Sequence, residues 1–186
     1  MSGKWHLGVE PPYRSLPSAK GFERSYALLQ GEHNHYGADQ TPQTAGHEGI
    51  SQYRFDGRET RYPEGAYSSD FFADKMIEFF NDARTDPRPF FAYLPFTAPH
   101  SPLQAPAALI AKYRGRYDDG PEAMRERRLA RMRELGLSVA EVPPAEIRGG
   151  KPWHELTPDD RRLEARKMEI YAAMIESMDA AVGRAD

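Results

Sequence analysis

Two chemically active side chains stand near the start of the sequence, within Gly3-Lys4-Trp5-His6-Leu7-Gly8. In an extended backbone Lys4 and His6 point to one face and Trp5 to the other, because successive side chains of a strand alternate. A cation and an imidazole on one surface, between glycines that let other groups approach closely, suit the binding of an anion at the end of a strand. Taken alone, such residues are more often a solvated lysine and a hydrogen-bonded histidine.

A third candidate, His100, lies in the proline-rich stretch 95–106, directly after the apolar run Pro89-Phe90-Phe91-Ala92-Tyr93-Leu94-Pro95. We expect this run to form a strand covered on both faces in a parallel sheet. Functional sites of open α/β sheets lie outside the carboxyl ends of the strands, where a histidine serves well as a general acid or base. The prolines serve equally well to reverse the chain, and both interpretations stay open.

The elements that must position these residues are mainly helices, which the sequence predicts over 67–84, 106–113, 121–135 and 158–182. In the first, Ser68 or Ser69 is expected to cap an apolar stripe. The last begins after the cap Thr157 and is expected to bury a face that includes Leu163, Tyr171 and Met178. Residues 9–64 have no sustained periodicity and are predicted to be loops with short strands. This order indicates an α/β architecture.

Composition excludes several classes of protein. The chain has 186 residues, of which 39% are hydrophobic, and its 25 basic and 28 acidic residues leave a net charge of −3, so no overall field attracts nucleic acid or anionic lipid. The absence of cysteine excludes a disulfide scaffold and a thiolate metal site. No apolar run approaches the roughly 20 residues that a membrane span requires, and the first residues lack the apolar core of a signal peptide. The compartment, cytoplasmic or periplasmic, and the oligomeric state stay unassigned.

Five segments, in order, resemble the sulfatase family and in particular bacterial arylsulfatases. They are residues 3–8, 21–29, 67–75, 89–100 and 171–179. The resemblance implies an alkaline-phosphatase-like α/β fold, in part a doubly wound sheet with flanking helices. It also implies hydrolysis of a small-molecule sulfuric ester at its S–O bond. The alternatives are a phosphonate or phosphate monoester hydrolase of the same superfamily, and a remnant without catalytic activity.

Carried over by position, the family's roles fall on three residues. Lys4 would bind the sulfate oxygens, His6 would hydrogen-bond a formylglycine hydroxyl and help to expel sulfate, and His100 would protonate the leaving oxygen. The formylglycine comes from a C-x-P-S-R or S-x-P-S-R motif, and neither occurs in this sequence. The family's Ca²⁺ ligands are likewise expected outside the chain. Residues 1–186 are therefore predicted to be an interior part of a single sulfatase catalytic domain, lacking the N-terminal nucleophile segment and the C-terminal segments, and to be inactive alone.

Three weaker signals have simpler interpretations. His33 and His35 have a spacing that could ligate zinc, with His47 as a third ligand, but we favour a polar loop beside the substrate pocket. The acidic pairs at 118–119 and 159–160 are interpreted as helix N-terminal residues rather than calcium ligands. The arginines of 125–133 alternate with glutamates and are expected on a solvated helix face.

Overall fold

A computed structural model describes residues 1–8, 15–46, 49–137 and 151–186. Its sheet has the strand order β1 (Ser2–Lys4), β2 (Tyr26–Leu28), β3 (Tyr53–Phe55) and β4 (Arg58–Thr60). The first two strands are parallel, with Lys4 opposite Leu28, and the other pairs are antiparallel. Two short 3-10 helices, η1 (Pro17–Lys20) and η2 (Trp153–Glu155), accompany four α-helices: α1 (Ser68–Asp82), α2 (Ala107–Lys112), α3 (Gly120–Glu134) and α4 (Pro158–Ala185).

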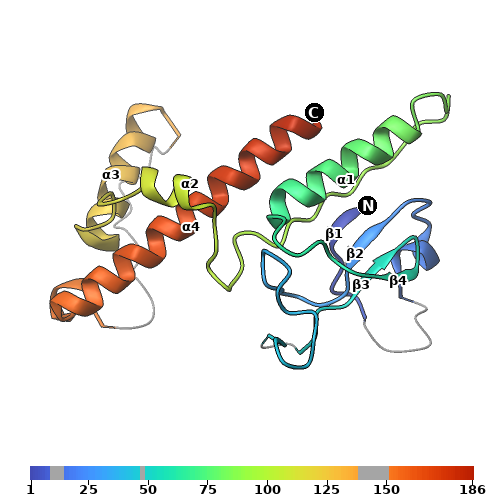
Figure 1. Cartoon of the computed structure of the whole chain (residues 1–186). Coiled ribbons are helices and arrows are strands. Elements are labelled where there is room, and N and C mark those ends of the chain that lie inside the picture. The colour runs from blue at the N-terminus through green and yellow to red at the C-terminus, as the bar shows by residue number, and fades with distance from the viewer. Residues whose placement is uncertain (9–14, 47–48, 138–150) are drawn as a thin grey trace.

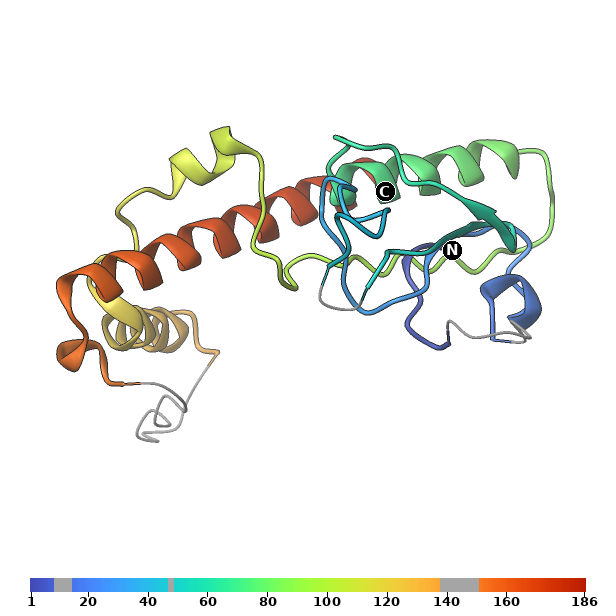
Figure 2. The same cartoon turned by 60° about the horizontal axis from the view of Figure 1, so that its bottom comes forward.

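The sheet divides the core into two layers. Side chains of β2 alternate, so that Tyr26 and Leu28 face one layer while Ala27 faces the other. The first layer is filled by aromatic rings and by α1, which lies over the sheet in both views (Figures 1 and 2). The second contains Trp5, whose indole nitrogen donates to the Ser15 carbonyl at 2.6 Å. Burial on both faces fixes the short strand β2.

The prediction of a strand at 89–95 is wrong, although part of this segment pairs with the sheet. Its last residues run parallel beside β1, since the Ser2 amide donates to the Tyr93 carbonyl at 3.0 Å and the Lys4 amide donates to the Pro95 carbonyl at 2.8 Å. Phe90 and Phe91, however, are 75% and 79% exposed, which contradicts burial on both faces. Among the described residues, β1 is the only strand that hydrogen-bonds to this segment. The apolar run 89–95 thus predicted burial on both faces, but the described part of the chain leaves Phe90 and Phe91 exposed.

All four predicted helices are confirmed, with two corrections. Ser68 and Ser69 do not cap α1, because Tyr67 occupies the cap position and both serines are buried in the first turn. The buried face of α4 carries the small residues Ala165, Ala173, Ser177 and Ala181, whereas most of the larger apolar residues predicted there are half-buried or exposed. Small side chains let the backbone of α4 lie close to its neighbours α1 and α2. Thr157 does cap α4, accepting from the Asp160 amide at 3.2 Å.

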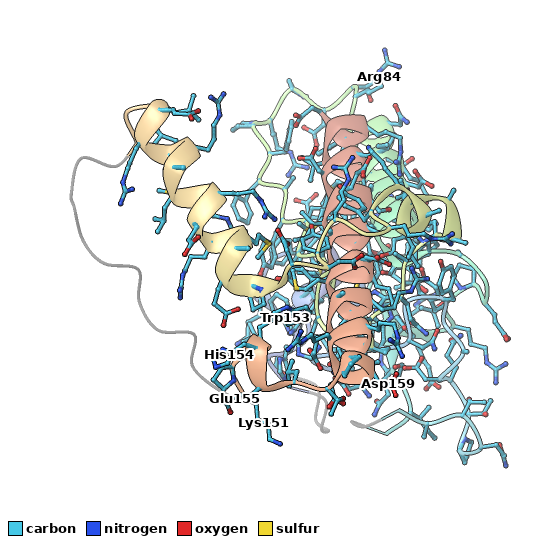
Figure 3. The ribbon with its side chains drawn as sticks, turned by 90° about the vertical axis from the view of Figure 1, so that its left-hand side faces the viewer. Arg84, Lys151, Trp153, His154, Glu155 and Asp159 are labelled. Atoms are coloured by element: carbon cyan, nitrogen blue, oxygen red, sulfur yellow. The ribbon has the colours of Figure 1, made fainter. Side chains whose placement is uncertain are left out.

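The N-terminal end of α4, away from the sheet, lies near α3 and η2, whereas α2 packs farther along α4, in a cluster with Ala173 and Met174 (Figure 1). Trp153 of η2 lies between the start of α3 and the start of α4 (Figure 3). A side chain at Gly120 would come within 2.6 Å of its ring, and the Arg161 guanidinium of α4 donates to its carbonyl at 2.9 Å. None of the described helices is both apolar enough and long enough to cross a bilayer.

Candidate functional site

Three chain segments end at one edge of the sheet. β1, β2 and residues 93–95 run in the same direction, so their carboxyl ends lie side by side. The first leads into Lys4 and His6, the second into Gly31 and Glu32, and the third into His100. Lys4 and His6 precede His100 by more than 90 positions, yet all three extend from the same edge of the sheet, where sites of open α/β sheets form.

His6 leaves β1 in an unusual backbone conformation. Its φ of 51° lies in the left-handed region, which costs a residue with a Cβ about 1–2 kcal/mol. This turn brings the imidazole against Gly31, where an added Cβ would lie 2.5 Å from the ring carbon Cε1. A side chain at position 31 would displace the His6 ring from this place. The Lys4 side chain, one position before Trp5, is half-buried at the same end of β1.

His100 is held through one ring nitrogen. Its Nδ1 donates to the Ser101 carbonyl at 2.9 Å and lies 3.5 Å from the Glu32 carboxylate. The same carboxylate accepts a hydrogen bond from the Ser101 hydroxyl at 3.3 Å. Because Nδ1 is used in this way, Nε2 is the nitrogen that is left to exchange a proton with a substrate. The exposed fraction of the His100 side chain is 49%, so a substrate can reach it.

Two buried histidines support the loop that carries His100. His33 bonds the Tyr53 hydroxyl at 2.6 Å and the Thr97 hydroxyl at 2.8 Å. His35 donates from Nε2 to the His100 carbonyl at 3.0 Å, so its Nδ1 accepts from the Ser68 hydroxyl at 2.7 Å. Burial, together with the neighbouring His35, lowers the pKa of His33 to about 3. Burial also lowers the pKa of His35, against the effect of its bond to the His100 carbonyl.

This arrangement gives the His33 and His35 pair a structural task. All four ring nitrogens have protein partners, so none has a lone pair left for zinc. His47 lies outside the described residues. The loop between Thr97 and Gln104 gains further anchors, since the His35 amide donates to the Gln104 side chain at 2.8 Å. Within this loop the Ala98–Pro99 and Ser101–Pro102 peptide bonds are cis.

A polar cleft of about 510 Å³ opens beside His100. It is lined by Glu32 and Ser101, which touch His100, and on its other side by Asp39 and Ser51. Asp39 is only 4% exposed. Its Oδ2 accepts from the Asn34 amide at 2.6 Å and the Ser51 hydroxyl at 2.8 Å. Its Oδ1 has no hydrogen-bond donor among the described residues.

Gly31, Glu32 and Asp39 were not predicted from the sequence. In the segment 32–37 only the histidines were candidates. Neither the contact of Glu32 with His100 nor the burial of Asp39 can be recognised from the neighbouring sequence. The acidic pairs lie at helix starts, as predicted: Asp119 precedes α3 and pairs with Arg127, and Asp159 in the first turn of α4 pairs with Arg162.

Comparison with known proteins decides the family. The family model described as Sulfatase matches residues 1–185, nearly the whole chain. The chain belongs to the sulfatase family. It is 43% identical over 190 residues to an uncharacterized sulfatase of Schizosaccharomyces pombe, covering 99% of this chain and 34% of that protein. An arylsulfatase of Klebsiella aerogenes is 36% identical over 183 residues, with 98% and 39% covered.

The fold of this sulfatase chain also matches solved structures. The crystal structure of Ps i-CgsB in complex with k-i-k-neocarrahexaose superposes with a TM-score of 0.61 at 23% identity, covering 98% of this chain and 31% of that one. The predicted fold class, a partial alkaline-phosphatase-like α/β sheet with flanking helices, is confirmed. The chain spans little more than a third of the length of the two curated relatives named above.

Proposed function

We propose that this chain carries the sulfate-binding and proton-transferring residues of a sulfuric ester hydrolase of the arylsulfatase type. The observation that carries the proposal is the common sheet edge from which Lys4, His6 and His100 extend. The membership of the sulfatase family and the arylsulfatase relative support the reaction. The substrate class is a small-molecule sulfate ester.

The proposed roles follow from where charge develops. The Lys4 ammonium binds the sulfate oxygens, and a formylglycine from the family's motif would supply the nucleophile. As the S–O bond to the alcohol breaks, its electron pair stays on the leaving oxygen, and His100 donates the proton on Nε2 to that oxygen. His6 would accept a proton from the nucleophile when sulfate is expelled. An ammonium and a proton donor both stabilise the transition state more than the ground state.

Two parts of the proposed reaction are not assigned to this chain. It has neither a cysteine nor an S-x-P-S-R sequence, so no residue is assigned as the formylglycine. The family resemblance also implies Ca²⁺, yet no three histidine, aspartate or glutamate side chains among the described residues lie together so that they could hold a metal ion. We assign no calcium site to this chain and derive no step through the metal.

A hybrid enzyme tests the proposal. This chain would replace the aligned 183-residue stretch of the Klebsiella aerogenes arylsulfatase, which supplies its own remaining parts. We expect hydrolysis of 4-nitrophenyl sulfate, with kcat/KM reduced at least about 100-fold by Lys4→Ala or His100→Ala and unchanged by Glu59→Gln on the exposed strand β4. Faster hydrolysis of 4-nitrophenyl phosphate or of a phosphonate ester would favour the phosphate-type alternative. A folded but inactive hybrid would favour the remnant.

The chain alone provides a complementary test. Without a formylglycine motif, we expect purified residues 1–186 neither to hydrolyse 4-nitrophenyl sulfate nor to bind Ca²⁺ tightly. Turnover by the purified chain that disappears in His100→Ala would contradict this expectation, and would show that another nucleophile acts at this sheet edge.

A further inference from the structure

The cleft beside His100 contains a buried carboxylate oxygen that lacks a donor. Asp39 is 4% exposed, and two short hydrogen bonds to Oδ2 fix its carboxylate, while Oδ1 has no partner in the described part of the chain. A buried charged acceptor without a donor is unfavourable unless a ligand supplies one. Since Asp39 lines the cleft, the missing donor is expected to come from a molecule bound there.

The lining defines the chemistry of that molecule. Glu32 and Asp39 are both acidic, and no lysine, arginine, phenylalanine, tyrosine or tryptophan is found among the described lining residues. An anion such as sulfate is therefore repelled. Groups such as Ser51 and Ser101 instead offer hydroxyls. The cleft suits a hydrogen-bond donor, either a hydroxyl or an ammonium group, on a polar framework.

The position of the cleft relates it to the proposed reaction. Glu32 and Ser101 line the cleft and also contact His100, the group proposed to protonate the leaving oxygen. The remainder of the leaving alcohol must lie next to that histidine. We propose that Asp39 and Glu32 form a subsite for the alcohol part of the substrate, and that this part is a saccharide whose hydroxyl or amino group donates to Asp39 Oδ1. This inference rests on the proposed function.

Binding of the desulfated product tests the subsite without any chemistry. Glucose and glucosamine are the probes, and saturation-transfer NMR with the 186-residue chain is the measurement. We expect saturation transfer to at least one sugar, lost in Asp39→Asn, which replaces the acceptor Oδ1 with a donor of the same size, and kept in Glu59→Gln. Absence of transfer to both sugars, or equal transfer in Asp39→Asn and wild type, overturns the proposal. Circular dichroism establishes folding, and if Asp39→Asn is unfolded, Glu32→Gln decides by the same criteria.

Kinetics of the hybrid enzyme separate the subsite from the reaction itself. On glucose 6-sulfate or glucosamine 6-sulfate, Asp39→Asn is expected to lower kcat/KM about 10- to 100-fold, the loss typical of a hydrogen bond to a charged group. On 4-nitrophenyl sulfate, whose leaving group has no donor, the loss should stay below about threefold. Equal losses on both substrate types would make Asp39 structural and overturn the subsite. Absence of hydrolysis with every sulfate would refute the proposed function instead.

Discussion

At the scale of single residues, the candidate site contains a backbone conformation that is unfavourable for residues with a Cβ. His6 adopts a left-handed φ of 51°, and its ring occupies the space that a side chain at Gly31 would need. Strain of this kind persists only where the surrounding structure enforces it. Here the enforcing contact is the hydrogen bond from the Trp5 amide to the Leu28 carbonyl at 2.8 Å, which keeps the chain paired with β2 up to the turn.

The backbone of His6 gives a prediction with an internal control. His6→Gly and His6→Ala both remove the imidazole, but only alanine must pay the cost of a left-handed φ. We expect His6→Gly to be more stable than His6→Ala by about 1 kcal/mol in thermal or urea unfolding. Both should lose activity in the hybrid enzyme to a similar degree. Equal stability would mean that the turn is not held left-handed.

The two buried histidines predict how stability depends on pH. The unfolded chain takes up a proton on each histidine near pH 6.5, whereas folded His33, with a pKa of about 3, takes up none down to much lower pH. Because the unfolded state then binds more protons, stability falls as pH decreases below about 6.5, by up to about 1.4 kcal/mol per pH unit for each histidine. Urea unfolding between pH 8 and 5 measures this slope.

His35→Gln tests the assignment of that slope. Its amide can still donate to the His100 carbonyl but cannot titrate, so the slope should be smaller than in the wild type. His154→Gln, which replaces an 81% exposed side chain on η2, is the matched control and should leave the slope nearly unchanged. An unaltered slope in His35→Gln would show that the titration of His35 is not what lowers stability in acid.

At the scale of elements, the pairing of β1 with residues 93–95 holds the site together. A side chain at Gly3, whose φ is 127°, would lie 2.1 Å from the Pro95 carbonyl oxygen, so only glycine permits this contact. Gly3→Ala should destabilise the protein by roughly 3 kcal/mol or more, through steric overlap added to backbone strain. Gly65→Ala is the control, because Gly65 has a φ of 87° with open space around it and should cost only about 1 kcal/mol. Thermal unfolding compares the two, and equal losses would refute the role of the close contact.

The elements also show how far the sequence alone could go. Long periodic segments such as 158–182 predicted their helices, because many residues contribute to one pattern. The strands of three residues are too short for such a pattern, and only Asp56-Gly57, a typical hairpin turn between β3 and β4 with φ of 47° and 82°, carried a local signal. The predicted site residues came from motifs. Asp39 and Glu32 escaped because their importance arises from burial and from contacts distant in sequence.

At the scale of the whole molecule, the structure has an exposed aromatic surface at the end of the strands opposite to the candidate site. Phe90 and Phe91 are largely exposed at the start of the segment that pairs with β1, and Phe80 of α1 lies with its ring centre 5.3 Å from that of Phe90. Clustered exposed aromatic rings favour association between molecules. Replacing Phe90 and Phe91 by serine should reduce self-association without lowering the melting temperature, because neither of these two rings is buried.

Light scattering coupled to size-exclusion chromatography measures this effect. Leu163→Ser provides the control, since Leu163 is 54% exposed on α4, remote from the two phenylalanines. A mass distribution that is unchanged by the double serine variant would show that the aromatic surface does not mediate association. A lowered melting temperature would show that the rings contribute to the core.

The alignment of β1 with residues 93–95 has a consequence for biosynthesis. Lys4 and His6 leave the ribosome before their partner segment, which follows about 90 residues later. Until that segment emerges, β2 is the one strand among the described residues that can pair with β1. The contact between Lys4 and Pro95 must then close a long loop, which is entropically costly and slow. During translation Lys4 and His6 are therefore present before His100, and β1 lacks its partner segment 93–95 until that segment is synthesised. A nascent chain stalled before residue 89 should be more susceptible to proteolysis near β1 than one released after residue 100.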